Sequence, residues 1–193
     1  MKRERRTSTV DMELRAAGEG APPVIFGYAA VFNQLSEDLG GFRERIAPGA
    51  FTKALGDDVR ALFNHDPNIV LGRTRSKTLR ISEDQKGLAI EIDPPATPAA
   101  ASLIESLRRG DISQMSFGFQ TVNDQWEMVD GAMVRTLMEV RLFDVSPVTY
   151  PAYPQTEAAL RSLDEFRKLS LEIEPENTGA PARMRMLAQL ASI

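Results

Sequence analysis

The stretch from Ser113 to Val122 constrains this chain most, because its side chains alternate in character as those of a β-strand do. One face of such a strand is apolar and would hold Met115, Phe117, Phe119 and Thr121. The opposite face would hold Ser116, Gly118 and Gln120. We expect the first face to pack on a core and Ser116 to lie on the more open face. Gly118 would then leave room for a peptide backbone beside Ser116.

Short apolar runs between turn-forming residues predict further strands. They cover residues 24–32, 42–46, 59–64, 69–73, 78–82 and 87–92, and a hairpin joins 121–128 to 133–144 around Asp130-Gly131. Prolines after residue 145 predict an end to regular pairing.

Helical signals are fewer. Thr97-Pro98 begins a helix that Gly110 ends, a short helix is expected at 50–55, and apolar residues at helical spacing predict another at 158–169. We therefore expect an α+β fold, mainly an antiparallel β-barrel with helices packed around it.

The length of 193 residues suits one domain with tails. We divide the chain into a flexible N-terminal arm at 1–20, a domain at 21–168 and a linker-like C-terminal tail at 169–193. The basic start has no apolar segment behind it, so it is not expected to be a signal peptide. A net charge of −4 argues against nucleic-acid binding, and no apolar run approaches the roughly 20 residues that span a bilayer. We expect neither a nucleic acid nor a membrane as partner.

Cysteine is absent and histidine occurs once, as His65. The first fact excludes disulfides, cysteine nucleophiles and thiolate metal sites. The second excludes zinc sites that need two histidines. No carboxylate loop has a metal-binding signature, so we expect no metal and no cofactor. In a hydrolase, the imidazole base would have to be His65.

Ser116 and His65 form the first candidate pair. Serine is a weak nucleophile that needs a neighbouring base, and the base needs an orienting group. His65 follows a predicted strand and precedes a proline-constrained turn, which is a usual place for a functional side chain. The alternative is an ordinary strand serine and a structural histidine. Backbone donors for an oxyanion cannot be assigned from the sequence.

Asp144 is the first candidate for the orienting acid. It alternates with Val140 and Leu142, so it would share their apolar face and would need a partner such as an imidazole N–H. Glu139 would lie on the other face with Arg141, where a solvent-exposed ion pair explains it. We place Glu139 second.

Six short motifs occur in order between about residues 20 and 160. They are Phe26–Phe32, Glu44–Phe51, Asn64–Asp66, Leu71–Arg73, Met115–Phe119 and Asp144–Tyr153. In this order and spacing they resemble the prohead (capsid maturation) protease family of tailed bacteriophages. The resemblance implies a fold similar to the herpesvirus assemblin proteases, a β-barrel ringed by helices.

The resemblance also implies an activity. The chain would be a serine endopeptidase with Ser116 as nucleophile and His65 as base. The herpesvirus relatives use a second histidine as third member, so here an acid would replace it, and the acid-Val-Ser match points to Asp144. That position is often Glu in the family.

Substrates, location and partners follow from the same resemblance. The substrates would be scaffolding protein or the scaffold segment of the capsid protein, and the chain itself, with residues 171–182 as a candidate site of self-cleavage. The protein would act inside the immature capsid in the host cytoplasm, or in a bacterial cytoplasm if a prophage encodes it. A homo-oligomer is left open.

Two other functions are compatible with the sequence. A non-enzymatic capsid or scaffold component with the same fold would use the stripe at Leu160, Leu163 and Phe166 to bind a partner. An esterase would use the same three residues, but the Gly-x-Ser-x-Gly signature of common esterases is missing.

Overall fold

The structure is a computed structural model that describes residues 3–9, 12–16, 22–150 and 163–164. All the strands among these residues lie in a compact unit that spans Met1–Pro154. The helix expected at 158–169 falls outside the described residues except at 163–164, and the tail at 169–193 falls outside them entirely. The boundaries of the domain at 21–168 stay a prediction.

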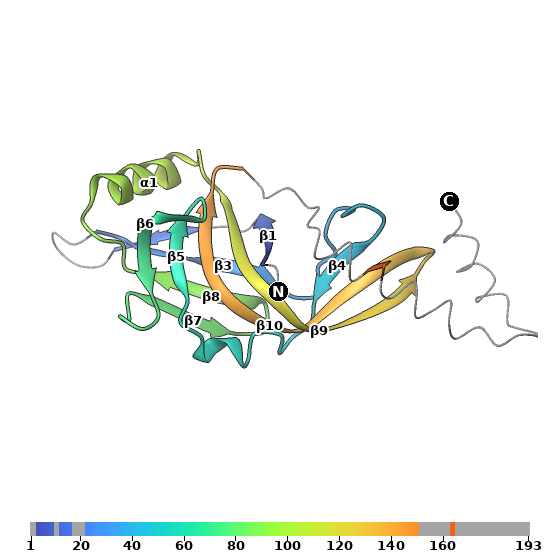
Figure 1. Cartoon of the computed structure of the whole chain (residues 1–193). Coiled ribbons are helices and arrows are strands. Elements are labelled where there is room, and N and C mark those ends of the chain that lie inside the picture. Colours follow the sequence, from blue (N-terminus) through green and yellow to red (C-terminus); the bar gives the residue numbers. More distant parts are fainter. Residues whose placement is uncertain (1–2, 10–11, 17–21, 151–162, 165–193) are drawn as a thin grey trace, which may run out of the picture. The chain divides into compact units, whose positions relative to one another are not determined.

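The first sheet is built around a long hairpin. Its strand order is β1-β9-β10-β5-β6, and β4 pairs with β10 beside that path. The strands span Glu4–Thr9 (β1), Arg43–Ile46 (β4), Arg60–Phe63 (β5), Asp66–Arg73 (β6), Gln114–Val129 (β9) and Ala132–Val148 (β10). Figure 1 shows β9 and β10 running side by side; they are antiparallel, whereas β4 and β5 run parallel to β10.

The second sheet has four antiparallel strands in the order β2-β3-β8-β7. They span Glu13–Arg15 (β2), Val24–Val31 (β3), Leu79–Glu83 (β7) and Gly87–Ile92 (β8). Apolar side chains of both sheets share one core, with Ile25 and Ile90 from the second sheet and Phe117 and Leu142 from the first. The mainly β prediction is confirmed. In the described residues the ladders form two sheets and do not close, so the expected single barrel is wrong.

Helix α1 spans Pro98–Arg109 and leads into β9. The Thr97 side chain accepts a hydrogen bond from the backbone N–H of Ala100, and Gly110 ends the helix in the left-handed conformation at φ 79°. Both signals were read from the sequence. The short helix expected at 50–55 is the 3₁₀ turn η1, Ala54–Gly56. Across the described residues, no helix is both long and apolar enough to cross a membrane.

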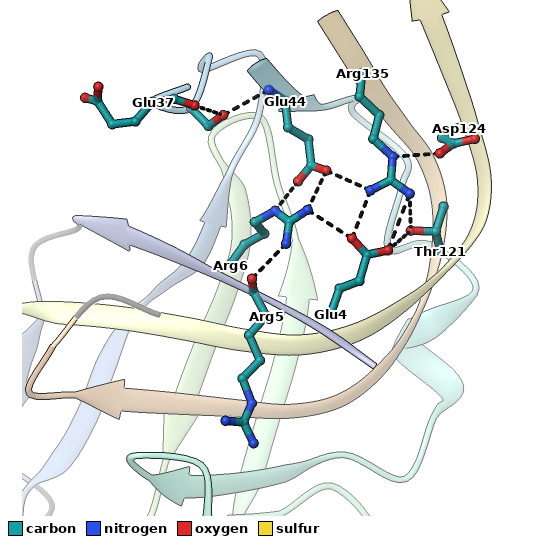
Figure 2. A network of polar contacts seen from close by, with 9 residues as sticks. Glu4, Arg5, Arg6, Glu37, Glu44, Thr121, Asp124 and Arg135 are labelled. Atoms are coloured by element: carbon teal, nitrogen blue, oxygen red, sulfur yellow. Dashed lines mark hydrogen bonds and ion pairs between the residues drawn. The ribbon is translucent and has the colours of Figure 1, made fainter. Parts of the chain in front are cut away.

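Strand β1 carries charged side chains into a buried network, shown in Figure 2. Its members are Glu4, Arg6, Glu44, Thr121, Asp124 and Arg135. The Arg135 guanidinium donates to Glu4 at 2.9 Å and to Glu44 at 3.0 Å, and Arg6 donates to the same two carboxylates. All four of these charged residues are buried. Each charge therefore has the paired, hydrogen-bonded surroundings that a buried ion needs.

This network explains a difference from the sequence prediction. Residues 4–9 were expected in a flexible arm, but they form a strand that pairs antiparallel with β9 and places Thr7 opposite Ser116.

Burial raises the pKa of the Glu4 carboxyl, but the charges of Arg135 and Arg6 and hydrogen bonds from Arg135 and Thr121 lower it more. The pKa of Glu4 therefore lies below its ordinary value.

Candidate active site

Ser116 lies in the middle of the first sheet. Strand β9 places it between Thr7 of β1 and Ser146 of β10. Its neighbours Met115 and Phe117 point into the core, as the alternation predicted. The other face is not open, however, because Ser116 is 0% exposed. The His65 side chain, from the β5–β6 turn, lies against the hydroxyl.

His65 is held in a tight turn between β5 and β6. Asn64 and His65 have φ of 53° and 57°, and Phe63 pairs with Asp66 across them, as in a two-residue hairpin of type I′. Asparagine and histidine both adopt this left-handed conformation more readily than most residues. The sequence predicted a turn at residues 66–68, directly after His65. In the structure the turn is one step earlier, at Asn64 and His65, and strand β6 already begins at Asp66.

The Asn64 side chain ties this turn to the end of β10. Its Oδ1 accepts a hydrogen bond from the Thr149 backbone N–H at 2.8 Å, and its Nδ2 donates to Thr149 Oγ1 at 3.2 Å. The Asn64 backbone N–H donates to the Pro147 carbonyl at 3.0 Å. Three hydrogen bonds therefore fix the residue before His65 against the strand that carries Asp144. Sequence reasoning missed this role, although an Asn directly before the only histidine was a usable signal.

Asp144 reaches the site through an irregularity in β10. Leu142 lies opposite Phe119, yet Asp144 lies opposite Gly118, so two steps along β10 match one step along β9. The extra residue, Phe143, makes a β-bulge, which shifts the following side chains to the other face. The predicted shared face of Asp144 and Leu142 is therefore wrong. The bulge turns Asp144 away from the core face and onto the face of Ser116.

Gly118 provides the space for this carboxylate. A Cβ atom at Gly118 would lie 2.2 Å from Asp144 Oδ2 and 3.1 Å from its Cγ. Such contacts are too close for any side chain. The glycine was expected to leave room for a peptide backbone, but Asp144 fills that room.

The structure brings the three first-choice residues into hydrogen-bond contact. His65 Nε2 lies 2.7 Å from Ser116 Oγ, and His65 Nδ1 lies 2.5 Å from Asp144 Oδ1. Because a carboxylate can only accept, Nδ1 carries the hydrogen and Nε2 is free to accept from the serine hydroxyl. This is the arrangement that a general base needs before it activates serine. Glu139, the second-choice acid, pairs instead with Lys53 at 2.7 Å.

Ser146 is a second buried hydroxyl at this site that sequence reasoning did not select. Its Oγ donates to Asp144 Oδ1 at 2.9 Å and lies 3.3 Å from His65 Nδ1. It stands two residues after Asp144, so the strand period puts both on one face. That spacing was the signal that could have identified it.

A serine hydroxyl bonded to an imidazole that is itself bonded to a carboxylate is the arrangement found in serine hydrolases. Comparison with known proteins shows to which family of serine hydrolases the chain is related. Residues 9–169 match the model of the caudovirus prohead serine protease family, and the chain belongs to this family. The resemblance seen in the sequence motifs is thereby confirmed.

Two individual proteins are similar to this chain. The chain is 30% identical over 161 residues to the prohead protease of Enterobacteria phage HK97, which covers 80% of this chain and 67% of that protein. It also superposes on the bacteriophage T4 capsid assembly protease, gp21, with a TM-score of 0.48 and 11% identity, over 78% of this chain and 98% of that one.

Proposed function

We propose that this protein is a serine endopeptidase of phage head maturation in which Ser116 is the nucleophile, His65 the general base and Asp144 the orienting acid. The observation that carries the proposal is the continuous set of contacts from Ser116 Oγ through the imidazole to Asp144 Oδ1. Membership of a family of prohead serine proteases supports the same reaction class.

The reaction follows from these contacts. Ser116 Oγ attacks the scissile carbonyl while its proton passes to His65 Nε2. Asp144 holds Nδ1–H and stabilises the imidazolium that forms. The imidazolium then gives the proton to the leaving amine, and the carbonyl carbon stays bonded to Ser116 as an ester. Water activated by the same imidazole hydrolyses that ester and restores the serine.

The substrates we propose are scaffolding protein or the scaffold segment of the capsid protein, and the chain itself. The name of the phage HK97 relative, prohead protease, supports action inside an immature shell within the host cell. We also retain a likeness to the assemblin fold as a proposal, in the form of two sheets and without the closed barrel, with Asp144 where the herpesvirus enzymes have a second histidine. The sequence motifs support it, and the two sheets over one core are compatible with it.

Catalysis also requires that a peptide can reach Ser116. Ser116 is fully buried in this arrangement, so a peptide reaches it only after a covering segment moves. Strand β1 is a neighbour of Ser116 on one side, and the Asn64–His65 turn is another. Tests of activity therefore use a preparation that assembles with its substrates.

The proposal is tested by coexpression with the capsid and scaffolding proteins of the same phage, followed by mass analysis of all fragments. Wild-type protein is expected to produce defined fragments, and Ser116→Ala none. Ser113→Ala is the matched control, because Ser113 is exposed and lies three residues upstream on the same segment. Equal fragment patterns from wild type and Ser116→Ala would contradict the proposal.

A further inference from the structure

We propose that Ser146 is a positioning residue for the Asp144 carboxylate; this inference rests on the proposed function. Ser146 is 0% exposed and lies directly opposite Ser116 in the β9–β10 ladder. Its Oγ is 2.9 Å from Asp144 Oδ1 and 3.3 Å from His65 Nδ1. One hydroxyl thus contacts two of the three groups that carry the reaction.

The direction of its hydrogen bond follows from the atoms present. A carboxylate accepts only, and a serine hydroxyl has a single hydrogen. Ser146 therefore gives its hydrogen to Asp144 Oδ1, the same oxygen that accepts from His65 Nδ1–H. Two donors on one oxygen hold the carboxylate in the orientation that keeps the proton on Nδ1. With the proton there, Nε2 remains the acceptor for the Ser116 hydroxyl.

The same geometry separates the roles of the two serines. Ser116 lies on the Nε2 side of the imidazole, whereas Ser146 lies on the Nδ1 side, where Asp144 already binds. A nucleophile at Ser146 would have no free ring nitrogen to receive its proton. Ser146 therefore acts through Asp144 and His65, and its loss should lower kcat more than it changes KM.

Because His65 is the only histidine of the chain, labelling with ¹⁵N-histidine gives an imidazole NMR spectrum of this one residue. In Ser146→Ala we expect displaced imidazole ¹⁵N and Nδ1-bound proton signals. We also expect kcat to fall about 10-fold, the order expected for one hydrogen bond to a charged group, with KM within about twofold. Ser146→Thr keeps the hydroxyl and is expected to restore both readouts toward wild type.

Val145→Ala is the matched control. Val145 is the preceding residue of β10 and is equally buried, but it belongs to the apolar core. We expect it to lower stability without moving the His65 signals. If Val145→Ala moved these signals as much as Ser146→Ala, the effect would come from packing and the proposal would be overturned.

The remaining outcomes distinguish this inference from the proposed function. Unchanged imidazole signals or unchanged kcat in Ser146→Ala, with Ser116→Ala inactive, would overturn the role of Ser146 and leave the proposed function intact. Ser146→Thr that behaves like Ser146→Ala in both readouts would also overturn it. Cleavage that survives in Ser116→Ala but stops in Ser146→Ala would overturn both, because Ser146 would then be the nucleophile.

Discussion

Asp144 and Gly118 face each other across the β9–β10 ladder, and the carboxylate of Asp144 occupies the place where a side chain at residue 118 would begin. Gly118 therefore makes room for the carboxylate of Asp144, which we propose as the orienting acid, and not for a peptide backbone. The bulge at Phe143 creates this pairing, so two local features of one hairpin set the position of the carboxylate.

Gly118→Ala should displace the carboxylate. The new Cβ would lie 2.2 Å from Asp144 Oδ2, so Asp144 must move away from His65 Nδ1. A displacement of about 1 Å at a reacting group costs on the order of 100-fold, and we expect the rate of capsid-protein cleavage, in a preparation that assembles with its substrates, to fall by about that factor. Gly56→Ala is the control, because a Cβ there would meet nothing within 4 Å. Equal activity of the two variants would contradict the role given to Gly118.

Asn64→Gly should loosen His65 without removing the turn. Glycine adopts the positive φ of this position, but it loses both side-chain hydrogen bonds to Thr149. We expect kcat to fall about 10-fold, because two hydrogen bonds that orient the base are lost. Asn33→Gly makes the same change at another left-handed asparagine, at φ 58°, and should leave kcat unchanged. If both variants kept wild-type kcat, the turn would not depend on the Asn64 contacts.

Arg135→Leu should destabilise the fold strongly. Arg135 is 2% exposed and forms ion pairs with Glu4 and Glu44. Its removal therefore leaves two buried carboxylates with too little positive charge beside them. Breaking a buried pair from one side costs about 3–5 kcal/mol, and urea unfolding should show a loss of that size. Arg80→Leu removes exposed pairs with Glu91 and Asp93 and should cost about 0–1 kcal/mol. Similar losses in the two variants would show that burial does not govern the Arg135 contribution.

The contribution of Glu4 should depend on pH in a defined direction. The pKa of Glu4 in the folded protein lies below the ordinary value of 4.5, so its ionised form stabilises the fold. That stabilisation is complete above about pH 4.5 and is lost as the pH falls through the lower, folded-state pKa. The difference in unfolding free energy between wild type and Glu4→Gln should therefore be largest near neutral pH and shrink in acid. A difference that stayed constant on acidification, measured by urea titration, would contradict the ionised pairing.

Local signals predicted much of the scaffold. The cap at Thr97 and the stop at Gly110 were readable because they depend on residues within one helix. The apolar runs located β3 to β8, and the Asp130-Gly131 turn located the long hairpin. His65 was the one candidate for an imidazole base, since the chain has one histidine. Ser116 was selected from its place on the strand and from the resemblance to the phage protease family.

Features that depend on how two strands pair could not be predicted from the sequence in the same way. Asp144 contacts His65, but the predicted face of Asp144 was wrong, because a strict two-residue alternation cannot reveal the bulge at Phe143. Strand β10 also continues through Pro147, where the prolines predicted that pairing would end. Pro147 has no backbone N–H to donate, but its carbonyl accepts a hydrogen bond from the Asn64 backbone N–H and so helps to hold the turn that carries His65.

The position of β1 was hidden for a different reason. Glu4 and Arg6 have the composition of a solvated arm, and charged residues are rarely buried without partners. Their partners, Glu44 and Arg135, lie far away in the sequence, so only the folded arrangement reveals that the charges cancel. The network joins β1 to β4 and β10, as Figure 2 shows. Strand β1 pairs with β9 and places Thr7 opposite Ser116.

The most direct measurement is covalent labelling with a fluorophosphonate in a preparation that is cleaving its substrates, followed by peptide mapping. We expect one modified serine, Ser116, and no modification when His65 is replaced by alanine, because the hydroxyl then lacks its base. Modification of Ser146 or of another serine, or a cleaving preparation in which Ser116 stays unmodified, would contradict the role of Ser116 as the nucleophile.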